Sequence, residues 1–260
     1  MSEPAVVALA SSPVPEWVVR IGMEIEHALA PARSVIEPLL ASRVTLGIWL
    51  ALNLVSLCLL WWDVRERNRN LPSMMKFVWS LVVAYSGPVG LAVYWVTGRT
   101  QMDSDSLWKR GFRSTAHCYS GCGVGEVIGI TAATIILGFT TFWVVVTTFV
   151  LAYLAGFAFT VGPLMQEGVG FGEAVNDALW SETPSITVME VVAIGTDLLL
   201  AGSAGWTEPL FWTALLFSLT VGFAAAYPVN VLLIELGVKE GMGSPAEMDG
   251  GRSEERGVAG

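Results

Sequence analysis

Charged side chains are scarce in this sequence. Asp, Glu, Lys and Arg make up 14% of the 260 residues, whereas a soluble domain averages about 25%. Cysteine is rarer still, and three cysteines in the whole chain are no disulfide framework. The sequence also lacks a phosphate-binding P-loop, a dinucleotide-binding glycine fingerprint after a strand, and a nucleophile elbow. These absences argue against the common enzyme classes, and we lean against an enzyme.

The sequence has long apolar runs instead. Apolar residues make up 53% of the chain, and the mean hydropathy is +0.60. Several runs reach the roughly 20 helical residues that cross a hydrocarbon core of about 30 Å. None of them alternates in the manner of barrel strands. The sequence therefore predicts an all-α fold, a polytopic helical membrane protein whose main partner is the lipid bilayer.

The apolar runs predict about six transmembrane helices. They cover residues 44–62, 77–97, two helices within 127–165, 186–201 and 209–236. The run 127–165 is about twice a membrane thickness, so we expect a tight turn near Gly138 to Phe142. Gly87-Pro88 interrupts the second run, and a kinked span is favoured there because a bundle tolerates Pro. The alternative is a re-entrant hairpin, which leaves five spans. The acidic stretch 166–183 is expected to be a loop.

The sequence divides into four parts. Residues 1–43 lack a signal-peptide pattern and repeat Trp17, Ile21, Ile25 and Leu29 every four positions. This spacing predicts an amphipathic helix on the cytoplasmic membrane interface. The other parts are two N-terminal transmembrane helices (44–97), a four-helix membrane core (112–243) and a disordered acidic tail (244–260).

The distribution of charge predicts how the protein lies in its membrane. The net charge of −9 comes mostly from acids near the termini and in 166–183. Basic residues flank the spans, so we expect no nucleic-acid partner. The positive-inside rule places the link before His117 and the C-terminus in the cytoplasm with six spans or five. Six spans also place the N-terminus inside, whereas five place it outside. We predict a multi-pass protein of the cell (inner) membrane.

One segment concentrates residue types that form sites. His117, Cys118, Cys122 and Glu126 follow one another at the start of the third apolar run, and the last three are four residues apart. On a helix, residues at that spacing lie on one stripe. The neighbouring stripe carries three glycines, which let another helix approach closely in lipid: Gly121, Gly125 and Gly129. We therefore expect one face to pack and the adjacent face to carry chemistry.

Acidic residues also occur inside the predicted spans. Glu126 lies about 12 Å along the helix from Cys118. An ionised carboxylate at that depth costs on the order of 3 kcal/mol, so such residues usually face the bundle interior and mark a site or pathway. Glu190 and Asp197 share one face of the fifth predicted span, and Asn230 lies in the sixth. We predict an intramembrane polar site, with packing carboxyls that hydrogen-bond to a neighbouring helix as the alternative.

The donor types suggest which ligand the motif could bind. Thiolate and imidazole suit copper, zinc or iron, whereas carboxylates favour harder ions or protons. His117, Cys118, Cys122 and Glu126 are therefore the candidate metal ligands. Cys-x3-Cys with one His is weaker evidence than paired Cys-x2-Cys units, because the remaining ligands must come from elsewhere.

Three segments carry a resemblance to a known family. They are the stretch from His117-Cys118 to Glu126, the run 152–162, and Tyr227-Pro228-Val229-Asn230 with the following residues 237–243. Over about residues 112–243 the chain resembles the membrane family catalogued as domain of unknown function 4396. The resemblance implies a four-helix membrane core and no assigned activity.

Three functional hypotheses follow. The first is a permease-like or transport-associated protein, in which the thiols capture a soft metal ion or small solute and buried acids pass a cation or proton. The second is a thiol-based redox or sensor module. The third is a structural membrane protein that docks a second copy or another membrane protein through its glycine stripe.

Overall fold

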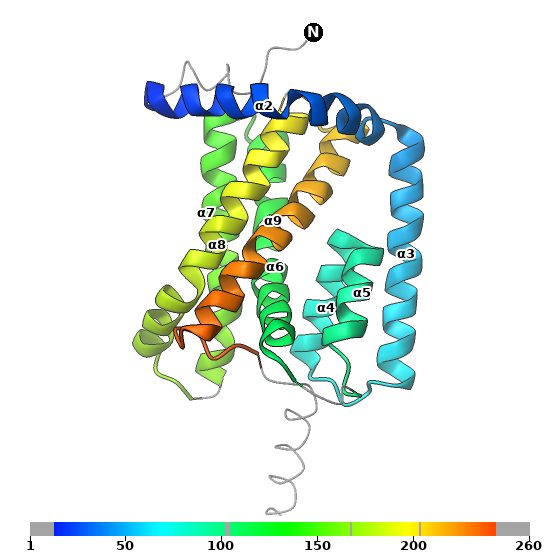
Figure 1. Ribbon diagram of the computed structural model, residues 1–260, viewed down its shortest axis with the longest axis vertical. Helices are drawn as coiled ribbons and strands as arrows, with labels where there is room; N and C mark the ends of the chain where they lie inside the picture. The colour runs from blue at the N-terminus through cyan, green and yellow to red at the C-terminus, as the bar shows by residue number, and fades with distance from the viewer. Residues whose placement is uncertain (1–12, 102–104, 167, 203, 243–260) are drawn as a thin grey trace, which may run out of the picture.

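The computed structural model describes residues 13–101, 105–166, 168–202 and 204–242, and every element in these ranges is helical. Figure 1 shows a bundle of long helices with one helix lying across its end. The elements are α2 (Glu16–Leu40), α3 (Arg43–Glu66), α4 (Ser73–Ser86), α5 (Pro88–Thr97), α6 (Leu107–Thr131), a π-helical turn (Ala132–Ile136), α7 (Thr141–Gln166), α8 (Phe171–Ala201) and α9 (Pro209–Glu235). This confirms the predicted all-α fold. The tail 244–260 lies outside the described residues.

Five described helices are long and apolar enough to cross a membrane, namely α3, α6 with its π-helical turn, α7, α8 and α9. The predicted turn within 127–165 is confirmed, because the chain reverses between Ile136 and Thr141. The expectation of a loop over 166–183 is wrong, since α8 already begins at Phe171. Its first turn carries Glu173, and an acid there is favoured by the helix dipole.

The predicted kinked span over 77–97 is wrong, because α4 and α5 form a re-entrant hairpin. Gly87 between them has a φ of 54°, a conformation that a glycine adopts easily. A Cβ added to Gly90 would lie 2.7 Å from the Val82 carbonyl oxygen, so α5 packs closely back on α4. With 14 and 10 residues, the two helices are about 21 and 15 Å long, too short to cross. Within residues 44–97, α3 is therefore the one described helix that is long and apolar enough to cross a membrane, whereas two were predicted.

A buried carboxylate fixes the base of this hairpin. Asp63, near the end of α3, accepts hydrogen bonds from the Tyr94 hydroxyl at 2.9 Å and from the Asn68 amide at 2.7 Å. It also forms a 2.7 Å ion pair with Arg99, which follows α5. Asp63 thus joins α3 to both ends of the hairpin region.

Helix α2 lies across one end of the bundle (Figure 1). None of its residues is buried, although Ile36 and Leu40 pack against the ends of α8 and α9. The Thr213 hydroxyl of α9 donates a 2.8 Å hydrogen bond to the Leu40 carbonyl. The segment after α9 lies at the other end of the bundle (Figure 1). An odd number of spans would place α2 and the C-terminal end of α9 on opposite sides of a membrane, as the five-span alternative predicts.

Candidate functional site

Helix α6 occupies the centre of the bundle and contacts α4, α5, α7, α8 and α9. Its glycine stripe lies against α7 of the same chain. A Cβ on Gly121 would lie 2.9 Å from the Gly156 Cα, and one on Gly129 would lie 2.7 Å from the Thr148 Cα. A Cβ on Gly125 would overlap the backbone of α7 at Leu151. The stripe is therefore covered within the chain and offers no docking face to another protein.

The two thiols of the motif are buried beside this contact. Cys118 and Cys122 are 1% and 0% exposed, and their sulfur atoms are 3.9 Å apart. A Cβ on Gly156 of α7 would lie 2.5 Å from the Cys122 sulfur, so α7 covers this thiol. Cys122 also interacts electrostatically with Glu190 of α8. The thiols thus lie at the junction of α6, α7 and α8.

Two buried carboxyl groups, one from α6 and one from α8, lie close enough to interact. Glu126 and Glu190 are 1% and 0% exposed and interact electrostatically. Oε2 of Glu126 and both carboxyl oxygens of Glu190 have no hydrogen-bond partner among the described residues. Asp197, further along α8, also interacts with Glu126, and its Oδ1 likewise lacks a partner. The predicted intramembrane acids therefore gather in one region.

Asn230 does not join these acids. It is fully buried near the end of α9, where its Nδ2 donates to the Ala226 carbonyl at 3.2 Å. Its Oδ1 accepts a 3.0 Å hydrogen bond from the Lys239 ammonium. Asn230 thus fastens the segment that follows α9.

The tip of the α4–α5 hairpin reaches this polar region from the other side. The Ser86 and Tyr119 hydroxyls are 2.7 Å apart, and the Thr220 hydroxyl of α9 donates to Ser86 at 3.2 Å. Tyr85 packs edge-on against Tyr119 and interacts electrostatically with Glu126. A broken helix therefore ends beside the buried acids.

His117 lies apart from the thiols. Its Nε2 is 2.9 Å from the Phe159 carbonyl oxygen of α7, and because a carbonyl only accepts, Nε2 carries the hydrogen. Nδ1 is buried without a partner among the described residues. Among the residues that the structure describes, no group of three or more His, Cys, Asp or Glu side chains could hold a metal ion. The four predicted ligands, His117, Cys118, Cys122 and Glu126, are therefore not brought together as a metal centre.

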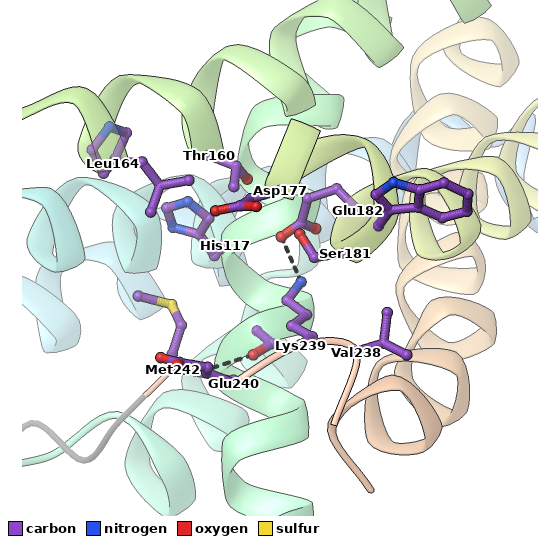
Figure 2. A pocket seen from close by; sticks show the side chains of 14 residues that line it. His117, Thr160, Leu164, Asp177, Ser181, Glu182, Val238, Lys239, Glu240 and Met242 are labelled. Carbon is purple, nitrogen blue, oxygen red and sulfur yellow. Dashed lines mark hydrogen bonds and ion pairs between the residues drawn. The ribbon is translucent and has the colours of Figure 1, made fainter. Parts of the chain in front are cut away.

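His117 instead lines a pocket of about 560 Å³ between α6, α7, α8 and the segment after α9. Figure 2 shows the side chains around this pocket, with Lys239 reaching from the segment after α9 toward Glu182 of α8. Lys239 and Glu182 form a 2.6 Å ion pair in which both side chains are largely buried. The Met242 N–H donates to the Ser114 hydroxyl at 3.0 Å, which holds this segment against α6.

Sequence reasoning missed several residues of these sites. It assigned Glu182 to a loop, because four acids without a basic residue resembled a solvated connection. It gave no role to Tyr85 and Ser86, because the kinked-span interpretation placed no helix end inside the membrane. Lys239 gave no sequence signal, since its partner Glu182 lies far away in the chain.

Comparisons with known proteins give a single finding about this region. A family model described as Domain of unknown function (DUF4396) matches residues 107–239, which is just over half of the chain. The match confirms the resemblance predicted over about residues 112–243. It covers the thiols, the buried acids and most of the pocket, and it leaves out α2 to α5. No curated protein and no solved structure matches the chain.

Proposed function

This chain belongs to the family described as Domain of unknown function (DUF4396), and we propose that it is a permease-like transport protein. In this proposal the buried carboxyl groups of α6 and α8 pass a proton or a small cation through the membrane. The proposal concerns the core that the family match covers.

The observation that carries the proposal is the buried carboxyl pair of Glu126 and Glu190, in which three of the four oxygens have no close hydrogen-bond partner among the described residues. Buried polar groups in proteins are nearly always hydrogen-bonded, because an unpaired group loses its water without compensation. Both oxygens of the fully buried Glu190 lack a hydrogen-bond partner among the described residues other than the Cys122 thiol, which is a weak donor. A carboxyl that served packing alone would bond to a neighbouring helix. These groups are better suited to a transient ligand such as a proton, a cation or water.

The placement of acids along α8 supports a path. Glu182, Glu190 and Asp197 lie on the same helix, and the 15 residues from the first to the last span about 22 Å. Glu182 borders the pocket at one end, and Glu126 of α6 interacts with both of the other acids. Steps between these groups would cover most of a hydrocarbon core.

The hairpin of α4 and α5 supports the same function. Helices that end inside the membrane are tolerated where they are buried in protein or line a cavity, and they recur beside the substrate sites of transporters. Here the helix break at Gly87 follows directly on Tyr85 and Ser86, and Tyr85 interacts with Glu126. In this proposal the hairpin tip is the element that opens or closes the path.

We further propose that the pocket faces the cytoplasm of a cell whose inner membrane holds the protein. The described chain carries nine Lys or Arg residues at the pocket end of the bundle and three at the α2 end. The nine are Arg65, Arg67, Arg69, Lys76, Arg99, Lys109, Arg110, Arg113 and Lys239. The positive-inside rule assigns this end to the cytoplasm and α2 to the outer surface.

A thiol redox function is the second candidate, and the 3.9 Å separation of the Cys118 and Cys122 sulfur atoms favours it. An oxidant would have to reach a pair that is almost completely buried. A disulfide within one helical turn would also constrain little of the fold. Oxidation would have to act through local packing against Gly156 and Glu190.

The transport proposal is tested by proton flux into liposomes that contain the purified protein and a trapped pH-sensitive dye. A potassium diffusion potential, set by valinomycin, drives the flux. Glu126→Gln and Glu190→Gln keep the side-chain volume and remove the titratable group, so either change should reduce flux at least about tenfold. Glu173→Gln, an exposed acid at the start of α8, is the matched control and should retain flux.

Sodium and potassium fluxes are measured in separate liposomes without valinomycin, which would itself carry potassium, to distinguish a proton from a cation. Flux that equals the protein-free background for all three ions would contradict the proposal. Flux that persists in the Glu126→Gln/Glu190→Gln double variant would place the path elsewhere. Each variant is first compared with the unmodified protein by size-exclusion chromatography, which shows whether it is folded.

A further inference from the structure

The pocket beside His117 is chemically distinct from the intramembrane acids. It lies at the end of the bundle where α9 finishes and is closed on one side by residues 238–242 (Figure 2). Its volume of about 560 Å³ is in the usual range for a small-molecule site and far exceeds one ion. The carboxyl groups of Glu126 and Glu190 do not line it.

Three residues that line this pocket have buried polar atoms without a hydrogen-bond partner in the described chain. The atoms are His117 Nδ1, Thr160 Oγ1 and Glu182 Oε2, contributed by α6, α7 and α8. His117 is 9% exposed and Glu182 3%. A buried polar group that is left unpaired loses its hydrogen bonds to water without compensation. Three together in one pocket indicate that a bound molecule satisfies them.

These three atoms share the ability to accept a hydrogen bond. His117 Nε2–H donates to the Phe159 carbonyl, so Nδ1 of the neutral ring is an acceptor. Glu182 Oε1 is held by Lys239, which leaves Oε2 as the free acceptor. The Thr160 hydroxyl both accepts and donates. A ligand that pairs with all three must supply several hydrogen-bond donors.

The charges around the pocket favour a cationic ligand. Asp177, Glu182 and Glu240 line it, whereas Lys239 is its only lining Lys or Arg among the described residues and is already paired with Glu182. Pro163, Leu164, Trp180 and Val238 supply apolar surface. The site thus combines surplus negative charge, hydrogen-bond acceptors and an apolar wall.

We propose that this pocket binds a small primary amine in its ammonium form. The three N–H donors of the ammonium match the three acceptors of His117, Thr160 and Glu182, and a short alkyl chain lies along the apolar wall. A metal ion fits less well, because no set of ligands that could hold one is found in the described residues. The assignment is independent of conduction through Glu126, so a failed flux assay would leave it intact.

The test is isothermal titration calorimetry on the full chain in detergent, with two ligands that differ only at the nitrogen. The n-butylammonium ion has three N–H donors, and butyltrimethylammonium has the same charge and chain but none. We expect saturable binding of n-butylammonium with about one site per chain, and at least tenfold weaker binding of butyltrimethylammonium. 1-Butanol, which lacks the charge, should give no saturable binding.

Thr160→Val removes one acceptor, keeps the side-chain shape and leaves the Glu182–Lys239 ion pair in place. Because a hydrogen bond to a charged group contributes about 1.5–3 kcal/mol, the Thr160→Val substitution should weaken n-butylammonium binding at least about tenfold. Thr147→Val, on the same helix but away from the pocket, is the control and should bind as the unmodified protein does. Three results would each overturn the proposal. They are equal affinity for the two ammonium ions, an unchanged affinity in Thr160→Val, and no saturable binding of n-butylammonium up to about 50 times the protein concentration, in the millimolar range.

Discussion

Lys239, beyond the end of α9, forms a 2.6 Å ion pair with Glu182 of α8. The Lys239 ammonium also donates to the Asn230 Oδ1 at 3.0 Å. A second set of bonds fastens the chain further on, where the buried Arg113 guanidinium donates to the Met242 carbonyl. The segment after α9 is therefore held over the pocket at two points, and the first of them depends on one charge pair.

Lys239→Met should release this segment and destabilise the protein. Removing one partner of a buried ion pair leaves the other charge uncompensated, which costs about 3–5 kcal/mol. The exposed fractions of 10% and 4% for the Lys239 and Glu182 side chains place the pair in this class. The expected result is a lower melting temperature in detergent and faster proteolysis after α9.

The double variant Lys239→Met/Glu182→Met is the control for this prediction. It removes both charges, so much of the lost stability should return, because no unpaired charge stays buried. A double variant that is no more stable than Lys239→Met would show that the loss comes from the packing of Lys239 and not from the charge of Glu182.

Gly125→Ala should destabilise the contact between α6 and α7. The added Cβ would overlap the α7 backbone at Leu151 and Ala152, which cannot move away without separating the helices. Overpacking of this kind costs up to about 3 kcal/mol. Gly195→Ala in α8 is the control, because a Cβ there meets nothing within 4 Å. It should raise stability by up to about 1 kcal/mol through helix propensity.

The same pair of variants tests the docking hypothesis. If the glycine stripe of α6 bound a second copy of the chain, Gly125→Ala would change the oligomeric state and leave the monomer folded. The structure predicts the opposite result, a lower melting temperature at an unchanged mass. Light scattering coupled to size-exclusion chromatography separates the two outcomes.

Gly87→Ala should weaken the re-entrant hairpin. The φ of 54° is strained for a residue with a Cβ, and the new atom would also lie 2.6 Å from Asn53 Oδ1 of α3. Together these effects should cost about 1–3 kcal/mol. Adding Asn53→Ala relieves the contact but not the backbone strain, so stability should recover only in part. Full recovery, measured by thermal unfolding, would show that the strain at Gly87 is negligible.

The sequence was sufficient to predict the helices whose apolar runs are long. The period of the runs and the membrane thickness fix α3, α7 and α9 to within a few residues, and the excess length of 127–165 requires a turn. The re-entrant hairpin could not be decided, because Gly87-Pro88 permits a kink as readily as a reversal. The contact of Gly90 with α4 selects the reversal, and that contact is not local in sequence.

The candidate sites were predictable to a smaller extent. Helical spacing placed Cys118, Cys122 and Glu126 on one stripe, and the cost of charge in lipid pointed to Glu190 and Asp197. Spacing could not show that His117 turns toward α7, because its partner is a backbone carbonyl of Phe159. Nor could it show the pocket, which forms only when the chain after α9 returns to α8.

The position of His117 leads to a prediction about metals. Because His117 lines the pocket beside α7, and no group of three or more His, Cys, Asp or Glu among the described residues could hold a metal ion, the two thiols lack the further ligands that a copper, zinc or iron site would need. Elemental analysis after growth with these metals should therefore give the same content for the unmodified protein and for Cys118→Ser/Cys122→Ser. A stoichiometric metal that disappears in the double variant would contradict this and restore the thiols as ligands.

The five-span arrangement predicts opposite locations for α2 and the C-terminal end of α9. The test uses a background without cysteine, obtained by replacing Cys58, Cys118 and Cys122 with Ala, and single new cysteines at two exposed positions. Glu24→Cys lies in α2 and Glu235→Cys at the end of α9. A membrane-impermeant maleimide added to intact cells or spheroplasts should label only the first, because the basic loops hold the other end in the cytoplasm. After lysis both should react.

Labelling of both positions in intact cells would contradict an odd number of spans, and labelling of Glu235→Cys alone would reverse the orientation and place the pocket outside.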